Sequence, residues 1–317
     1  MALDIVQAGP LSLLQDLGRY GYQDVGVTPG GAMDTHAFHW ANKLLNNPAN
    51  AAQIEITMGP FKACFKQATS FALCGADVVA TLNGNKIIPW SSWFAKAGDI
   101  LEIGYPRQGL RSYLAVSGGF FCPKTFGSVS TVMRNKLGGL SKKGSKVANG
   151  DIIPFIAKVQ PHTRKVPQQF IPEYKSVINI GVLTTYQFHQ FSTEAKKTFF
   201  NELYTVTSEI DRMGYRLKGK PIEFAQQSFV SEGIALGAIQ IPANGQPIIL
   251  MRDRQTIGGY PKMGCVCNRD LNIVAQATPG TQIRFFEQDL YEAEADLHQE
   301  QHYFFKGNND ADYSNID

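Results

Sequence analysis

Three short stretches in the second half of the chain concentrate charged and amide side chains beside glycines. They are Ser208–Leu217 (SEIDRMGYRL), Ser231–Pro242 (SEGIALGAIQIP) and Arg252–Pro261 (RDRQTIGGYP). Glycine lets the backbone approach a ligand closely, while Arg, Gln, Asp and Thr supply donors and acceptors for a small polar molecule. The alternative is a set of polar turns that cap a barrel. Three such stretches so close together favour a site.

The residue types in these stretches suggest roles. Asp253 could accept a proton, Arg212 could hold a carboxylate or phosphate, and Gln255 or Gln240 could bracket an amide. The apolar run before Asp253 and the Gly-Gly-Tyr turn after it predict that Asp253, Gln255 and Thr256 lie at a strand end, where the mouth of a barrel could present them to a ligand. We therefore expect catalytic roles for Asp253, Gln255 and Arg212. Substrate-binding roles are expected for Gln240, Thr256, Gly258, Gly259, Tyr260 and Ser231.

Two residue pairs have spacings that a metal could use. His36 and His39 lie three residues apart, but Lys43 shares their stripe, which is typical of a solvated polar helix face. Cys265 and Cys267 form a C-x-C without a second pair downstream, whereas structural zinc needs four ligands. We expect no metal site.

Two glycine-rich segments resemble phosphate loops. In the loop from Gly26 to Asp34, the carboxylate of Asp34 occupies the position of a phosphate and is expected to cap the helix that follows. In Gly139–Lys146 (GLSKKGSK), serine precedes lysine, the reverse of the order that a P-loop requires. A basic surface turn is the simpler interpretation, although its lysines could help to hold an anion. The chain also lacks a Gly-x-Ser-x-Gly elbow and an Ala-Met-Lys-Met biotin site. A full nucleotide fold or biotin would therefore come from another chain.

Composition excludes several classes of protein. With 44% hydrophobic and 18% charged residues, the 317-residue chain has material for packed cores and is long enough for two lobes. The net charge of +3 is scattered, without the basic stripe of a nucleic-acid-binding protein. The least charged long stretch, 233–251, contains prolines and amides that exclude a membrane span. Five cysteines without regular spacing, and an N-terminus unlike a signal peptide, favour the cytoplasm.

Thirty glycines and sixteen prolines predict many short strands and few helices, hence barrels or sandwiches. We expect a first β lobe at 1–155, a proline-rich connector at 156–175, a second β lobe at 176–290 and an acidic tail at 291–317. The first lobe should hold a helix at 35–45, strands at 54–58, 71–82, 98–103 and 111–116, and a hairpin at Asn83-Gly84. The second should begin with a strand at 177–182, then contain a helix near 193–203 and strands to about 287. The tail should begin as a helix and fray at GNNDADYSNID.

Several motifs together resemble one family. QDLGRYGY, GVTPGGAMD, IEITMGP and RSYLAVSGGF occur in order, followed by DRMGYRL, SEGIALGAIQIP, DRQTIGGYP and AQATPGTQIRF. This series resembles the KipA-like, carboxyltransferase subdomain A/B proteins over residues 5–287. The resemblance implies a mainly β fold of two cyclophilin-like β-barrel lobes with a few short helices. Two departures stand in the first lobe: Val129 replaces the usual arginine in GSVST, and Ser-Lys-Lys replaces the usual Gly-Arg after Gly139. The family's anion contacts there are therefore not carried over.

The resemblance also implies a function. It indicates one component of an ATP-dependent 5-oxoprolinase, which acts with two partners, a KipI-like B subunit plus a LamB/YcsF-like A subunit, and is inactive alone. The complex would open the lactam of 5-oxo-L-proline to L-glutamate, with ATP bound at the level of the complex. One alternative is the carboxyltransferase half of a biotin-dependent urea carboxylase, with biotin on another chain. Another is a KipA-like regulator that binds a kinase inhibitor.

Overall fold

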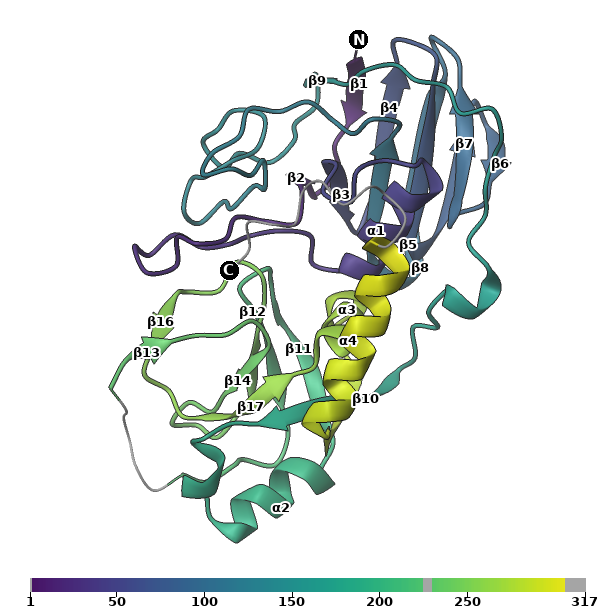
Figure 1. The fold of residues 1–317 in the computed structure, drawn as a ribbon. Helices are drawn as coiled ribbons and strands as arrows, with labels where there is room; N and C mark the ends of the chain where they lie inside the picture. The colour runs from purple at the N-terminus through teal and green to yellow at the C-terminus, as the bar shows by residue number, and fades with distance from the viewer. Residues whose placement is uncertain (1, 225–229, 306–317) are drawn as a thin grey trace.

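The computed structural model describes residues 2–224 and 230–305, and the predicted GNNDADYSNID segment lies outside them. The fold is mainly β, as predicted. Strands between residues 2 and 154 form one curled nine-stranded sheet, and strands between 177 and 287 form a closed seven-stranded barrel (Figure 1). Only the second lobe is thus a closed barrel among the described residues.

The first-lobe sheet runs in the order β2-β3-β8-β4-β1-β9, and β5 pairs with β6, β7 and β8. Its inward side chains form a core in which Ile54, Phe65 and Phe71 are fully buried. The strands are β1 Ala2–Gln7, β2 Leu11–Gln15, β3 Gln53–Thr57, β4 Phe61–Phe65, β5 Thr69–Leu82, β6 Asn85–Ile87, β7 Ser91–Ala95, β8 Ile100–Val116 and β9 Ile152–Pro154.

Local turn chemistry predicted the β5–β6 hairpin correctly. Asn83 and Gly84 both have positive φ, of 51° and 78°, as the favoured two-residue hairpin turn requires. The separation of 98–103 from 111–116 was wrong, because both belong to the single long strand β8. Register shifts between β5 and β8 let the two strands stay paired along this length.

The second-lobe barrel runs in the order β10-β17-β14-β15-β12-β11-β18, and β10 and β18 pair in parallel. A separate two-stranded ribbon of β13 and β16 lies beside it (Figure 1). We call this ribbon the arch. The strands are β10 Val177–Thr184, β11 Tyr204–Ile210, β12 Gly214–Lys218, β13 Glu232–Gly233, β14 Ala238–Gln240, β15 Ile248–Leu250, β16 Ile257–Gly258, β17 Lys262–Val266 and β18 Gln282–Glu287.

Four α-helices and two 3₁₀ turns occur in the described part of the chain. The predicted cap of the first helix is confirmed, since Asp34 Oδ1 accepts a hydrogen bond from the Ala37 amide at 3.0 Å. The third helix was not predicted. The helices are α1 Thr35–Leu44, α2 Thr193–Asn201, α3 Asn268–Gln276 and α4 Leu290–Phe305, and the 3₁₀ turns are η1 Gln168–Phe170 and η2 Phe188–Gln190.

The polar face of α1 is covered, so the prediction that it is solvated was wrong. Helix α4 runs from the barrel to α1 (yellow in Figure 1). There His39 is only 8% exposed and stacks on Phe304 at 5.2 Å between ring centroids. Lys43 Nζ donates to the Tyr303 carbonyl at 2.8 Å. A contact between segments some 260 residues apart cannot be seen in the local pattern around α1.

Helix α3 joins the two lobes through amide side chains. Gln276 is 2% exposed, and its Oε1 accepts from the backbone amides of Leu110 and Arg111 at 2.8 and 2.9 Å. Its Nε2 donates to Asp34 Oδ2 and to the Arg111 carbonyl at 2.7 and 3.0 Å. All four hydrogen-bonding positions of this amide are thus used across the lobe boundary, which orients the barrel against the sheet.

Candidate functional site

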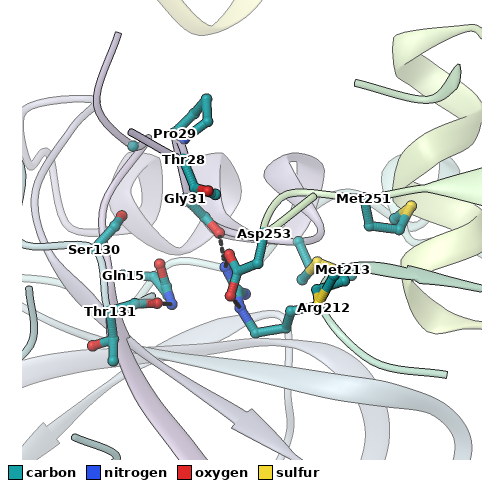
Figure 2. Close-up of polar contacts among 12 residues, drawn as sticks. Gln15, Thr28, Pro29, Gly31, Ser130, Thr131, Arg212, Met213, Met251 and Asp253 are labelled. Carbon is teal, nitrogen blue, oxygen red and sulfur yellow. Dashed lines mark hydrogen bonds and ion pairs between the residues drawn. The ribbon is translucent and has the colours of Figure 1, made fainter. Parts of the chain in front are cut away.

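A buried ion pair lies where the two lobes meet. Arg212 Nε and Nη2 donate to the two carboxylate oxygens of Asp253 at 3.0 and 2.9 Å, a bidentate geometry. The same Nη2 donates to the Gly31 carbonyl of the first lobe at 2.7 Å (Figure 2). Gly31 has φ +102°, and a Cβ there would lie 2.7 Å from the Leu17 carbonyl oxygen, so only glycine fits.

The third member of this group is Glu55, in the middle of β3. Its Oε1 accepts from Arg212 Nη1 at 2.6 Å, while its Oε2 accepts from the Tyr113 hydroxyl and the Met33 amide, each at 2.8 Å. Arg111 Nε lies 3.9 Å from Oε1. Glu55 is fully buried, and Arg212 and Asp253 are each 5% exposed. We call Glu55, Arg212 and Asp253 the interlobe triad.

The charges of the triad depend on one another. Burial opposes the ionisation of Glu55, but Arg212 and Arg111 outweigh it and hold the pKa of Glu55 below its ordinary value. Burial alone would lower the pKa of Arg212, yet the two carboxylates raise it. Burial raises the pKa of Asp253, which Arg212 opposes. Removing one member would leave an uncompensated charge in the interior.

This geometry corrects the expected placement of Asp253. Its carboxylate does not lie at an open barrel mouth, because it is 5% exposed and held by Arg212, which also contacts the first lobe. Arg212 engages both carboxylate oxygens of Asp253, which stabilises the ionised form and opposes the uptake of a proton from a ligand. The arrangement is typical of a structural ion pair that fixes two lobes.

The other predicted residues gather around the arch. Gly258 in β16 pairs with Glu232 in β13. A Cβ built on Gly258 would lie 3.1 Å from Gln240 Nε2 and 3.6 Å from Gln255 Nε2, so both amides approach this glycine. Gln240 is 1% exposed, and its Nε2 is a buried donor without an acceptor among the described residues. An unsatisfied buried donor of this kind is costly and therefore suggests a ligand contact.

A lysine that was not predicted as a site residue lies below the arch. The Nζ of Lys262, in β17, contacts Glu232 Oε1 in an ion pair, and the lysine is 6% exposed. Gln187 Nε2 donates to the same carboxylate oxygen at 2.9 Å, and the Tyr186 hydroxyl contacts Oε2. Gln187 Oε1 accepts from the Lys262 amide at 2.7 Å, which fixes the glutamine. We call Gln187, Glu232, Gln240, Gln255, Gly258 and Lys262 the arch site.

The remaining predicted site residues are exposed, are partly buried, or contribute a backbone contact. Ser231 is exposed and immediately precedes β13, while Thr256 contributes its backbone carbonyl to the Ile234 amide at 3.0 Å. Gly259 is partly buried and Tyr260 is 49% exposed at the end of the arch. The structure therefore brings Gln240, Gln255 and Gly258 together but separates them from the interlobe triad.

Sequence reasoning missed Glu55, Glu232, Lys262 and Gln187. Glu232 and Lys262 stand at the edges of two stretches already singled out, so their proximity to those stretches was an available signal. Glu55 lies between two isoleucines in a strand-like run and carries no local mark of function. Its place in the triad depends on the contact with Arg212 of the second lobe.

The first lobe does not provide a nucleotide cradle among its described residues. Lys142 and Lys143 lie in an exposed turn, and Lys146 Nζ donates to the Pro10 carbonyl at 3.0 Å. Val129 is 4% exposed and packs in the first-lobe core, while its amide donates to Asp16 Oδ2 at 2.9 Å. These residues do not fit the triphosphate of ATP, so we derive no step through ATP on this chain.

Metal ligands and membrane spans were sought across the same described ranges. They contain no group of three or more His, Cys, Asp or Glu side chains placed to hold a metal ion. All five cysteines are free thiols, and burial raises the pKa of Cys267 to about 11. None of the helices within 2–224 and 230–305 has the length and apolar character to cross a membrane.

The chain is similar to several known proteins. The family model described as "Carboxyltransferase domain, subdomain A and B" matches residues 25–287. The 5-oxoprolinase C subunit of Escherichia coli K12 is 36% identical over 305 residues, covering 95% of this chain and 96% of the relative. The corresponding C subunit of Haemophilus influenzae is 32% identical over 296 residues, covering 92% and 93%.

A solved structure gives the same result for the fold. The urea amidolyase of K. lactis superposes with a TM-score of 0.90 at 27% identity, covering 96% of this chain and 20% of that one. The region matched by the family model includes the triad, the arch and most of both lobes. The chain therefore belongs to the carboxyltransferase subdomain A and B family.

Proposed function

We propose that this chain is the C subunit of an ATP-dependent 5-oxoprolinase. In this proposal it acts in the cytoplasm with two partners, a KipI-like B subunit plus a LamB/YcsF-like A subunit, to convert 5-oxo-L-proline to L-glutamate. The observation that carries the proposal is the match to two proteins named as 5-oxoprolinase C subunits over 93% or more of their own length. ATP belongs to the complex.

The second candidate is carboxyl transfer to a urea-like amide. The K. lactis structure favours it, with its TM-score of 0.90. That relative, however, is 27% identical to this chain, whereas the two 5-oxoprolinase C subunits are 36% and 32% identical. The higher sequence identity therefore favours 5-oxoprolinase. Both candidates act on an amide-type group, and in the second the biotin would be on another chain.

We place the amide substrate at the arch site. A lactam presents a carbonyl acceptor and an N–H donor on one edge, and Gln240 offers an unused amide N–H in a buried position. Lys262 supplies a positive charge that can stabilise an oxyanion, and Glu232 can hold a proton once the lysine turns to the substrate. Because Gly258 has no side chain, Ile234 can pack within 2.6 Å of the position that a Cβ would take, and the Gln240 amide can approach the same position at 3.1 Å.

The interlobe triad has a positioning role in this proposal. β13 and β16 belong to the second lobe, and the Asp253 carboxylate lies two residues before Gln255 on the same segment. Arg212 therefore anchors the segment that carries the amide to the first lobe. Asp253 would support the arch through this anchor and would not touch the substrate.

A surface of exposed apolar side chains supports binding to a partner protein. Tyr20, Tyr22 and Val25 project from one loop, at 57%, 38% and 69% exposed. Phe126 of a second loop, 45% exposed, contacts Tyr22 with ring centroids 5.0 Å apart. Both loops lie on the left of the first lobe in Figure 1, on the side of the arch. We define these four residues as the loop patch and assign it to the KipI-like partner, because exposed aromatic groups of this kind are typical of interfaces.

The first test is reconstitution. The purified chain should not hydrolyse 5-oxoproline, and glutamate should form only when the KipI-like and LamB/YcsF-like partners and ATP are all added. Glutamate release is measured with each component omitted in turn. Robust turnover by this chain alone would contradict the proposal, and so would a reconstituted complex that carboxylates urea and leaves 5-oxoproline intact.

The second test separates the arch site from the triad. In the reconstituted complex, Lys262→Met should lower kcat/KM of the folded fraction by about two orders of magnitude, and it should also lower the melting temperature because the lysine pairs with Glu232 of the arch. Asp253→Asn should instead cost about 3 kcal/mol of stability, because it weakens a buried ion pair, while the folded fraction keeps its rate. Steady-state kinetics and thermal unfolding are measured on both variants. A rate loss of about 100-fold in Asp253→Asn with an unchanged melting curve would instead indicate a catalytic role for Asp253.

The third test concerns the loop patch. Phe126→Asp should weaken binding of the KipI-like partner by about tenfold or more, since a charge at the centre of an apolar interface is costly. Phe94→Asp is the matched control: Phe94 is 40% exposed on β7, away from the patch. Affinities are measured by calorimetry with the purified partner. Equal affinity for the two variants would exclude the patch as the interface.

A further inference from the structure

A groove lies between the two lobes. None of the residues that line it belongs to the arch site. It has a volume of about 830 Å³, is open to solvent, and is lined by residues of α1, α3, α4 and the connector after η1. This volume is within the range of small-molecule sites. Nothing in the proposed reaction uses this groove.

One end of the groove is aromatic. Trp40 lies 5.3 Å from Phe170, 5.5 Å from Tyr303 and 5.5 Å from Phe304, measured between ring centroids. Lys43 Nζ lies over the ring of Tyr303, 4.4 Å from its centroid. The electron-rich faces of such rings attract cations.

The charges around the groove leave one carboxylate without a partner. Arg269 pairs with Asp296 at 3.3 Å, and Lys175 pairs with Glu173 at 3.5 Å. Glu300 on α4, by contrast, is partly buried and has neither a hydrogen bond nor an ion pair within the described part of the chain. A carboxylate drawn out of water without a partner favours the arrival of a cation.

Two buried hydrogen-bond donors at the groove also lack an acceptor in the described ranges. Trp40 is 4% exposed, and its Nε1–H has no acceptor among the residues that the structure describes. Tyr174, on the connector wall, has a buried hydroxyl in the same state. A ligand with a carbonyl oxygen could accept from these donors if small movements of the side chains opened them.

We propose that this groove binds a small organic cation, an amine or guanidine that also carries a carbonyl acceptor. The cationic group lies between Glu300 and the rings of Trp40 and Tyr303, and the carbonyl accepts from Trp40 Nε1 or the Tyr174 hydroxyl. Binding is independent of 5-oxoproline turnover, since none of these residues belongs to the arch site.

The pKa of Glu300 predicts that ligand binding to this site depends on pH. Burial raises the pKa of Glu300, an effect opposed by His36 and Arg269 and reinforced by Asp34 and Asp296. A bound cation would lower that pKa. Binding should therefore release protons and tighten as the pH rises through the raised pKa of free Glu300, reaching a plateau once the carboxylate is ionised.

The experiment uses two matched probes on the full chain. N-acetyl-L-argininamide carries a guanidinium and amide carbonyls, whereas N-acetyl-L-citrullinamide has nearly the same shape without the charge. We expect the arginine probe to bind saturably with a Kd at or below about 1 mM, and the citrulline probe at least about tenfold more weakly. Binding is measured by calorimetry and by tryptophan fluorescence. Equal binding of the two probes, or no saturation by the arginine probe, would overturn the proposal.

Substitutions on α4 and α1 test which residues form the site. Glu300→Gln should remove the discrimination between the probes and, because it deletes an unpaired charge, should not lower the melting temperature. Glu294→Gln, at an exposed position beside His298, should keep both affinities. Trp40→Phe should weaken both probes by a similar factor. Discrimination that survives Glu300→Gln in a normally melting protein would also refute the site.

Discussion

Arg212 satisfies two carboxylates and a backbone carbonyl with one guanidinium, and the relative position of the two lobes depends on it. Asp253 belongs to its own lobe, whereas Glu55 and Gly31 belong to the other. Since all of these groups are buried, none can exchange its partner for water. Separating the lobes would therefore break the contacts of Arg212 with Glu55 and with the Gly31 carbonyl and leave both acceptors without this donor. Gln276 and its four hydrogen bonds extend the same contact.

This constraint explains how a ribbon as small as the arch can hold a site. Two-residue strands are too short to be stable by themselves. The arch is supported on one side by the anchored segment after Asp253, and on the other by the contact of Glu232 with Lys262 and Gln187. Amide and charged groups are thereby held near Gly258 with an unused donor on Gln240. Preorganisation of this kind is what a site for a small amide needs.

Features governed by local chemistry could be predicted from the sequence. Asp34 as a helix cap and Asn83-Gly84 as a hairpin turn depend only on neighbouring residues. Features that depend on distant contacts were not predicted. In β3 the alternation of Ile54, Glu55 and Ile56 places Glu55 on the face opposite the core, which is typical of a solvated residue. The second lobe covers that face, and no local pattern records it. The burial of His39 under α4 has the same cause.

A double-mutant cycle on the Glu55–Arg212 pair tests the central claim most directly. Glu55→Gln, Arg212→Met and the double variant are unfolded in urea at neutral pH, and the coupling free energy is obtained from the four stabilities. The account predicts a coupling of at least about 1 kcal/mol at neutral pH. Because the folded-state pKa of Glu55 is lowered, this stabilisation is present above the ordinary glutamate pKa and is lost as the pH falls through the folded-state value. Stabilities that add within about 0.5 kcal/mol at neutral pH would show that the pair does not hold the lobes together.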